Sequence, residues 1–564
     1  MHAQVKPGGG LKSFIIFPIL ALVYCAVHYG WQPLSLVTHA NAKFGYILNF
    51  FLTYVIIPAF IVLFLSLFFI KNKKIEQSKT RGSEVKSPRN ANKELEKAFK
   101  SSTKSIFGTA KHRICLGREK VLFPRPSESE GTLCLGQQGS GKTQAILSII
   151  EQVEEAKETM IIYDVKDGIT GDFFGRYYRH GQDYLLHTGD VRCLRWNLMA
   201  ELRSEADIDF AVSNIVISSA DSMNSTSEHF QEQVRMLLKA AFLTVIHTVK
   251  SPTNCDLILF LLRNDTAERF SEACENTGII RRYGISVSSI LTKDAQGASA
   301  WATANRYFTR LKNRNFYHGD SGFSISDFVE KSRDENMDIR LFIVNPTETQ
   351  ELNRVYFKLF FSFISRAIRS LPTRLDRRIW LFLDEFQTLG KAPELVEQLP
   401  AEARSKGACL VLASQNLAKI KEVYGENLTN AILSGSKTKL IFSLGDDYSS
   451  GKIEKILGEK EVEETHFSVS KGHEMESTRH SIGASSKTVK AVLSSEISSL
   501  PKLCAYYQTA HILTQINFEI LKIPNQTQQI VAPEPPFFGD CPAEKKDENM
   551  NIVEQSNQDL ILEF

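Results

Sequence analysis

The chain has 564 residues, of which 43% are hydrophobic and 23% charged, and its formal net charge is +3. This length predicts about three or four globular domains, and the small net charge alone indicates nothing about nucleic acid. Nine cysteines include no C-x-x-C pair, and several lie in apolar segments. We therefore expect reduced, buried thiols facing a cytosol, which argues against a disulfide framework or a zinc site.

Two apolar segments lie near the N-terminus. Residues 13–29 are almost wholly apolar, and residues 44–70 carry no charge and exceed the roughly 20 residues that cross a bilayer. A signal peptide is the alternative for the first segment, but no A-x-A cleavage site precedes Gln32. Lysines and arginines crowd residues 71–89, so the positive-inside rule places both termini in the cytoplasm. We expect residues 1–70 to form a two-span membrane anchor.

The segment that follows, residues 71–104, is polar and basic, with few large apolar side chains before Leu95. It predicts a flexible or helical linker that lies near anionic lipid headgroups. DNA binding by this linker is the alternative.

Residues 136–143, with the sequence GQQGSGKT, match the P-loop pattern at every required position. An apolar segment precedes them and a potential helix follows, as the strand–loop–helix context requires. A glycine-rich turn before a helix is the plainer alternative. Lys142 is expected to reach the β- and γ-phosphates of ATP, and Thr143 to hold Mg²⁺. The remaining residues expected to surround phosphate are Gly136, Gly139, Ser140 and Gly141.

Short apolar runs alternate with helical patterns after the P-loop. They comprise residues 160–163, 341–344, 409–413 and 438–442. Such runs between helices predict a parallel sheet covered on both faces, in which residues at the carboxyl ends of the strands line the ligand crevice.

A further apolar run, residues 379–383, ends in Asp384 and Glu385, which is the Walker B pattern. Asp384 is expected to stabilise Mg²⁺, and Glu385 to polarise the attacking water as a general base. An acidic pair that only begins a surface helix is the alternative. Gln415 ends the run at 409–413, where an amide can sense the γ-phosphate or be an ordinary strand end.

Between Trp196 and about Gly322 the pattern becomes helical, with residues 228–238, 256–262 and 301–311 as the clearest helices. We expect an all-α insertion between the second and third strands of the nucleotide-binding sheet.

Taken together, these motifs resemble the TraD/TrwB-type coupling proteins of type IV secretion, the membrane ATPases of bacterial conjugation. The resemblance covers roughly residues 120–535 and the two-span layout. Departures are Ser326 in place of an arginine, Phe386-Gln387 in place of Leu-Pro, and a short loop between the spans. Besides the Walker motifs, the matching segments are WNL at 196–198, FSI at 323–325, residues 384–389, 393–400, 402–408, 413–416 and 422–425, and SLP at 499–501.

The resemblance implies an α/β fold: a RecA-like P-loop NTPase domain with an all-α insertion, preceded by two transmembrane helices. It implies a homo-hexameric ATPase at the inner membrane that drives single-stranded DNA with its bound relaxase from the relaxosome into a type IV secretion channel. Arg404 would be an arginine finger offered to the neighbouring subunit. Arg125 matches the family's arginine upstream of the P-loop, and its role stays open.

Two alternatives remain: an FtsK-like translocase of double-stranded DNA, and a substrate-docking receptor that uses ATP for assembly. The acidic C-terminal segment is expected to be disordered and, as in F-type coupling proteins, to bind a relaxosome accessory protein; an inert tail is its alternative. The expected parts are the anchor 1–70, the linker 71–104, the nucleotide-binding domain 105–198 and 323–531, the insertion 199–322 and the tail 532–564.

Overall fold

The computed structural model describes residues 78–105, 113–165, 173–216, 225–312, 323–332, 338–471, 478–522 and 528–531. The predicted membrane spans in residues 1–70 and the predicted tail, 532–564, lie outside these ranges. Within the ranges, no helix combines the length and the apolar character that crossing a bilayer requires.

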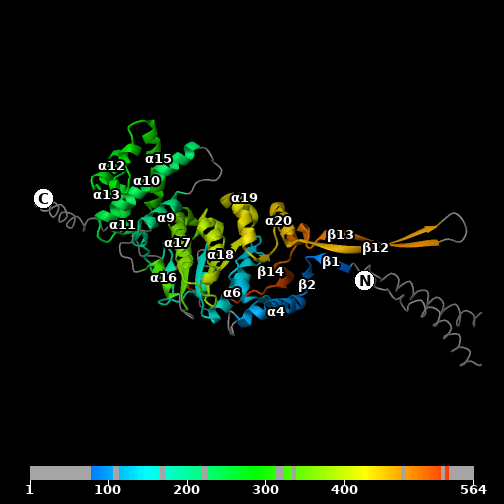
Figure 1. Ribbon diagram of the computed structural model, residues 1–564. Helices are drawn as coiled ribbons and strands as arrows, with labels where there is room; N and C mark the ends of the chain where they lie inside the picture. The colour runs from blue at the N-terminus through cyan, green and yellow to red at the C-terminus, as the bar shows by residue number, and fades with distance from the viewer. Residues whose placement is uncertain are drawn as a thin grey trace, which may run out of the picture. The chain divides into compact units, whose positions relative to one another are not determined.

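A mixed ten-stranded sheet forms the centre of the larger of two units (Figure 1). Its order is β2-β15-β14-β11-β5-β10-β9-β6-β8-β7. From β11 to β7 each neighbouring pair is parallel, whereas β14 pairs antiparallel with β11 and β15. The strands are β2 Val85–Lys86, β5 Thr132–Leu135, β6 Thr159–Asp164, β7 Tyr184–Leu186, β8 Arg340–Val344, β9 Ile379–Leu383, β10 Ala408–Ser414, β11 Thr438–Ile441, β14 Cys504–Thr509 and β15 Ile512–Asn517.

Both faces of the parallel part are covered, as the continuous apolar runs predict. Every residue of β5, β6, β8, β9 and β10 is buried, and alternate side chains enter two cores: Leu133 and Leu135 enter one, and Cys134 the other. The first core also receives α17 (Gln350–Ser370) and α19 (Leu417–Gly435), and the second receives α6 (Lys142–Glu155). The predicted parallel sheet is confirmed, with antiparallel strands added at one side. All cysteines among the described residues are free thiols.

The second half of the predicted linker is part of this fold. β2 pairs with β15, and α4 (Pro88–Ser105) buries Ala91 and Leu95 completely. The helix α4 agrees with the helical alternative for this segment. From Val85 onward, however, the segment packs on the folded unit, because a few small and apolar side chains in a basic segment suffice to dock one helix on a sheet edge.

Between β7 and β8 every described element is helical, and Figure 1 shows α10, α11, α12, α13 and α15 grouped together. The short strand β7 was missed, so the insertion follows the third strand counted from β5 and not the second. Trp196 and Phe323 form a parallel β-bridge, so the chain enters and leaves the insertion at one place. The helices are α8 Leu198–Glu201, α9 Glu205–Ile215, α10 Ser225–Thr248, α11 Asn254–Arg263, α12 Ala267–Glu275, α13 Ile279–Arg282, α14 Val287–Ile290, α15 Ala295–Leu311 and α16 Ile325–Lys331.

A long hairpin, β12 (Glu459–Lys471) and β13 (Thr478–Lys490), was also missed. Its outer part, residues 463–485, belongs to the smaller of the two units. The remaining elements are β1 Ser78–Gly82, β3 Ile114–Leu116, β4 Val121–Phe123, α5 Arg125–Glu128, α7 Phe173–Tyr177, the short helices η4 Thr347–Thr349, η5 Phe386–Leu389, η6 Glu394–Gln398 and η7 Arg404–Lys406, α18 Leu399–Glu402, α20 Asp447–Leu457 and α21 Ser494–Ser498.

Candidate active site

The P-loop joins the buried strand β5 to α6, as its sequence predicts. Gly139 and Gly141 have φ angles of 74° and 118°, a region that favours glycine. At Gly136 an added Cβ would lie 2.5 Å from Cβ of Phe442, so no side chain fits there. The loop therefore presents bare backbone at the N-terminus of α6, the arrangement that binds phosphate.

Two side chains of the loop fit an anionic ligand. Lys142 is 7% exposed, and its Nζ donates to the carbonyl oxygens of Gly136 and, at 3.4 Å, Gln137. The Ser140 hydroxyl is buried without a hydrogen-bond partner, which costs about 1–3 kcal/mol unless a ligand oxygen supplies the missing partner. Thr143, the second residue of α6, is half-buried. This chemistry matches a triphosphate with its Mg²⁺.

Three parallel strands bring the other predicted residues to the same edge. β10 lies between β5 and β9, and Ser414 is level with Leu135; its carbonyl accepts from the Gly136 amide at 3.3 Å. Gln415 therefore follows β10 beside the loop, and Asp384 follows β9 about 10 Å from β5 at the usual strand spacing. Burial raises the pKa of the Cys134 thiol to about 12; the positive charge of Lys142 opposes this rise, and the negative charge of Asp384 adds to it. Lys142 and Asp384 therefore both lie close enough to Cys134 to affect its pKa.

The acidic pair after β9 is held in a fixed conformation. Asp384 is 5% exposed and its amide donates to the Tyr163 carbonyl at 3.1 Å. Glu385 has φ 51°, a left-handed conformation that costs energy and persists where surrounding structure imposes it. Its carboxylate accepts from Nε2 of Gln387, and its carbonyl accepts from the Thr388 hydroxyl at 2.8 Å. Gln387, a departure from the family pattern, thus orients the candidate general base.

Polar residues at neighbouring strand ends were not predicted as part of the site. Asp164 and Asn345 end β6 and β8 and are buried. Nδ2 of Asn345 donates to the Tyr163 hydroxyl at 3.2 Å, which lies 2.9 Å from the Thr388 hydroxyl. Oδ1 of Asn345 is buried without a partner. An apolar strand followed by a polar residue was the signal that could have identified these positions.

Arg404 is not brought together with the other candidates. It precedes β10 and so lies where the parallel strands begin, which we call the amino edge of the sheet. Its Nη2 lies 2.6 Å from Oε1 of Glu130, which precedes β5. The arginine side chain is 55% exposed. Within one chain, Arg404 and Lys142 therefore lie at opposite edges of the sheet.

Arg125 belongs to a buried ion network at that same amino edge. Its Nη1 lies 3.1 Å from Glu128 and 2.7 Å from Glu158. Arg378 lies 2.8 Å from the same Glu128 carboxylate, and both side chains are 1% exposed. Burial raises the pKa of Glu128, and the two arginines oppose that rise. In this structure, therefore, Arg125 and Arg378 together supply the positive charge that the buried Glu128 carboxylate requires.

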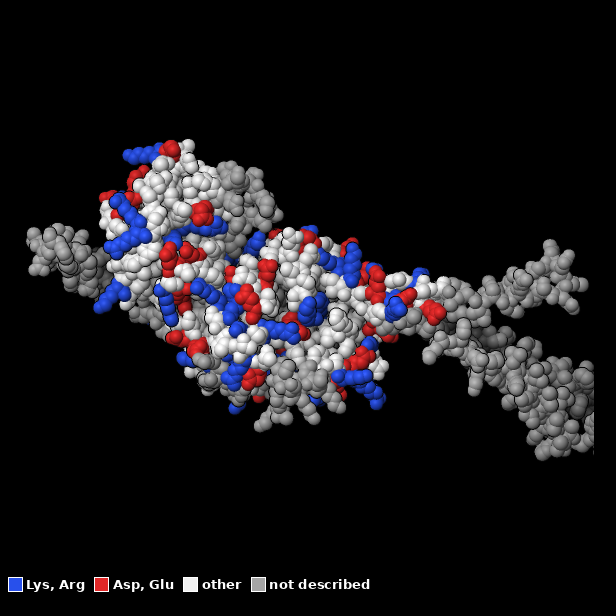
Figure 2. Space-filling model, viewed as in Figure 1, with Lys and Arg blue, Asp and Glu red and all other residues white. Residues whose placement is uncertain are grey.

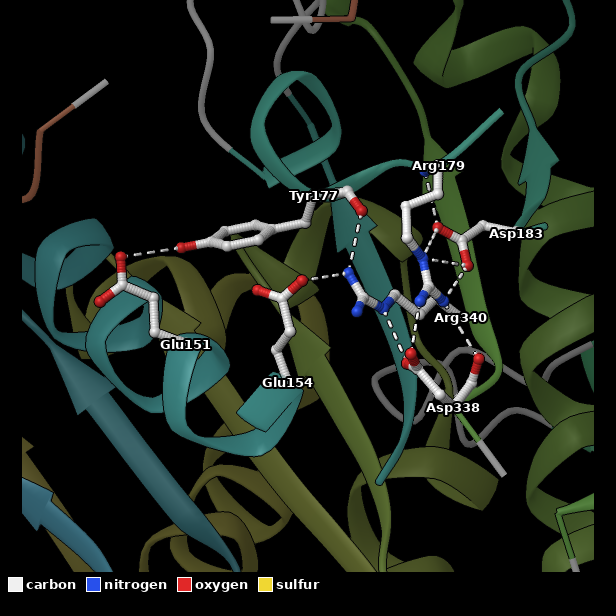
Figure 3. Close-up of polar contacts among 7 residues, drawn as sticks. All are labelled: Glu151, Glu154, Tyr177, Arg179, Asp183, Asp338 and Arg340. Atoms are coloured by element: carbon white, nitrogen blue, oxygen red, sulfur yellow. Dashed lines mark hydrogen bonds and ion pairs between the residues drawn. The ribbon is translucent and has the colours of Figure 1, made fainter. Parts of the chain in front are cut away.

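A second ion network fixes the far end of the P-loop helix (Figure 3). Arg340, at the start of β8 and 2% exposed, contacts Glu154 of α6 at 2.8 Å, Asp338 at 3.2 Å and the Tyr177 carbonyl at 3.1 Å. Asp338 also pairs with Arg179, and these arginines lower the pKa of its carboxyl. The helix that begins at the P-loop is thus anchored to the sheet at its other end.

Residues next to β11 and β14 contact the P-loop directly. The Leu503 amide donates to the Ser140 carbonyl at 2.8 Å. The Ser443 hydroxyl accepts from Nε2 of Gln137 at 3.1 Å and donates to the Ser498 carbonyl at 2.8 Å. The SLP segment at 499–501 therefore leads the chain onto the P-loop, a role that its sequence did not reveal.

Comparison with known proteins agrees with this geometry. The family model of the type IV secretion-system coupling protein DNA-binding domain matches residues 115–520, more than half of the chain. The coupling protein TraD of Escherichia coli (strain K12) is 25% identical over 421 residues, which cover 73% of this chain and 54% of TraD. The chain thus spans about half the length of this curated relative.

Solved structures share the fold. The bacterial conjugative coupling protein TrwBdeltaN70 in its unbound monoclinic form has a TM-score of 0.66 at 19% identity, covering 81% of this chain and 97% of that one. TrwB in complex with ADP and Mg²⁺ has a TM-score of 0.65 at 19% identity, covering 82% and 98%. With the strand-end site and the family match together, the chain belongs to the type IV secretion-system coupling proteins.

Proposed function

We propose that this chain is an ATP-driven DNA translocase that links the relaxosome to a type IV secretion channel in bacterial conjugation. The observation that carries the proposal is the meeting of the P-loop with Asp384 and Glu385 at one sheet edge in a coupling-protein chain. TrwB has been solved with the ATP analogue ADPNP and with ADP and Mg²⁺, which supports ATP and Mg²⁺ as the ligands here.

The residues divide the work of hydrolysis. Bound ATP supplies the phosphoryl group that water accepts. The loop amides and Lys142 bind and neutralise phosphate oxygens, and Thr143 and Asp384 hold Mg²⁺. Glu385, oriented by Gln387, accepts a hydrogen bond from the attacking water. Gln415, beside the loop, senses the γ-phosphate. Its Oε1 accepts from Lys419 at 2.8 Å, and its Nε2 is the group that donates to a phosphate oxygen.

Arg404 acts in trans. Because it lies at the opposite edge of its own sheet, it serves the P-loop of a neighbouring subunit, and a closed ring of six identical head-to-tail interfaces would give every site such an arginine. Its exposed position supports this assignment.

DNA is gripped through its phosphate backbone without sequence readout. On the face shown in Figure 2, basic and acidic side chains of the described residues are interspersed, and no broad basic surface appears. Local groups of cations are therefore the expected contacts.

The remaining parts serve membrane attachment and partner recognition. Residues 1–70 anchor the protein in the inner membrane by two spans with both termini cytoplasmic, and the tail 532–564 engages a relaxosome accessory protein. The division into nucleotide-binding domain and insertion at residues 199–322 is part of the same proposal, as are the relaxase-bound single-stranded DNA and the secretion channel as partners.

DNA-stimulated ATP hydrolysis by the purified protein tests the proposal. We expect stimulation by single-stranded DNA above the basal rate. Equal hydrolysis with and without any DNA would favour the substrate-docking receptor, and stimulation by duplex DNA alone would favour the FtsK-like translocase. A Lys142→Ala protein controls for contaminating ATPases.

A further inference from the structure

Three cations gather where the helical insertion meets α17. Arg354 and Lys358 are four residues apart on α17 and so project from one side of the helix. The Tyr356 hydroxyl donates to the Leu311 carbonyl at 2.8 Å, which docks the end of α15 on α17. Arg310 precedes Leu311, and the charges of Arg310 and Arg354 both act on Lys358. We call Arg310, Arg354 and Lys358 the α15–α17 cation cluster.

Among the described residues, the positive charge of this cluster is only weakly compensated. No described residue accepts a hydrogen bond from Lys358 or forms an ion pair with it, and burial together with the two arginines lowers its pKa to about 7. Nε of Arg354 is buried without a partner, and the carboxylate that pairs with Arg354, Glu351, is 80% exposed, so the pair contributes little. Like charges placed together in a partly buried position are unfavourable unless an anion joins them.

We infer that the α15–α17 cation cluster binds a backbone phosphate of single-stranded DNA. A phosphate offers several acceptor oxygens to two guanidinium groups and an ammonium, the combination that positions nucleic acid without reading its sequence. The choice of DNA as the source of the phosphate rests on the proposed function.

The cluster also touches the catalytic segment. Cδ of Arg354 lies 3.3 Å from the position of a Cβ built on Gly390. Gly390 follows η5, the short helix that begins directly after Glu385. A phosphate bound by Arg354 would change how its guanidinium packs against Gly390. It would therefore act on the segment that carries the candidate general base. The same site thus couples DNA engagement to hydrolysis.

Two charge-neutralising variants test the inference in the full chain, purified in detergent or nanodiscs. Lys358→Gln and Arg310→Gln should each weaken binding of labelled oligo-dT by about three- to tenfold, and lower the slope of log affinity against log salt by about 0.7. Both should keep basal ATPase activity but lose much of its stimulation by DNA. Removing a partly buried charge should leave the Tm of Lys358→Gln at or above that of the parent.

Lys239→Gln is the matched control. Lys239 lies on α10, in the same insertion as Arg310, and Glu205 and Asp209 pair with it at 2.6 and 2.8 Å. Its replacement therefore removes a cation that already has anionic partners. Affinity should stay at the parent value. Unchanged affinity and salt slope in Lys358→Gln would overturn the inference alone, whereas a parent protein that binds no oligo-dT would overturn the proposed function and the inference with it.

Discussion

Replacing Arg404 by alanine tests how the active site is completed. Glu130, the partner of Arg404, lies in the turn before β5, whereas Gly136 follows the last residue of that strand. The four residues of β5 alone span roughly 13 Å. No rotamer of Arg404 closes that gap in its own chain. If Arg404 supplies charge to the transition state, it does so only from a neighbouring subunit.

The expected loss is large. Arginine fingers contribute about 10³–10⁵-fold to hydrolysis, so Arg404→Ala should reduce kcat by at least about a thousandfold while the affinity for ATP stays near that of the parent. Mixing equal amounts of Arg404→Ala and Lys142→Ala subunits should restore activity, because about one interface in four then joins an intact P-loop to an intact arginine in a randomly mixed ring.

Phosphate release by the mixed oligomers measures this rescue, and native mass spectrometry establishes that the subunits have mixed. We expect about a quarter of the parent rate for independent interfaces, and less where the sites must fire in sequence. Activity that stays at the level of the separate variants, in oligomers shown to be mixed, would refute the trans assignment.

Further changes probe other parts of the chain. Lys142→Ala should abolish ATP turnover and DNA transfer with membrane insertion retained, and Glu385→Gln should bind ATP without hydrolysing it; conjugation frequency and nucleotide-binding assays check both. Arg378→Ala, which leaves Glu128 buried without its closest cation, should destabilise the fold by about 3–5 kcal/mol, seen as a lower Tm. Burial lowers the pKa of Lys358 to about 7, and a DNA phosphate favours its protonated form. The affinity for oligo-dT should therefore decrease as the pH rises from about 6 to about 8, and Lys358→Gln should lose this pH dependence. Deleting residues 559–564 should leave ATPase activity unchanged but reduce cognate transfer and binding of the accessory protein.

The parallel centre of the sheet was predictable because each of its strands is buried on both faces. Continuous apolar runs produced β5, β6, β8, β9, β10 and β11 near their observed bounds. The polar residues after these runs then located the active edge, since parallel strands place their carboxyl ends together. Asp384 and Gln415 were found by this rule, and Asp164 and Asn345 satisfy it equally.

The edge strands and the braces of the P-loop were not predictable in the same way. β7 has three residues and β2 has two, too few to show a period. Leu503 contacts Ser140 through backbone atoms, and Ser443 contacts Gln137 through its backbone carbonyl as well as its hydroxyl. Backbone contacts leave no residue pattern in the sequence. Glu128 follows Arg125 by three residues, but Arg378 reaches the same carboxylate from a distant part of the chain, and no local pattern indicates that contact.

The amino edge of the sheet explains why Arg404, among its arginines, can serve a second subunit. Arg378 is 1% exposed and shares Glu128 with Arg125, so withdrawing it would strand a buried carboxylate at a cost of about 3–5 kcal/mol. Arg404 is 55% exposed and its partner Glu130 is 20% exposed, so that pair contributes about 0–1 kcal/mol. If Arg404 acts in trans, the side chain would leave Glu130 at this small cost and would be able to alternate between Glu130 and a neighbouring subunit's phosphate within each ATPase cycle.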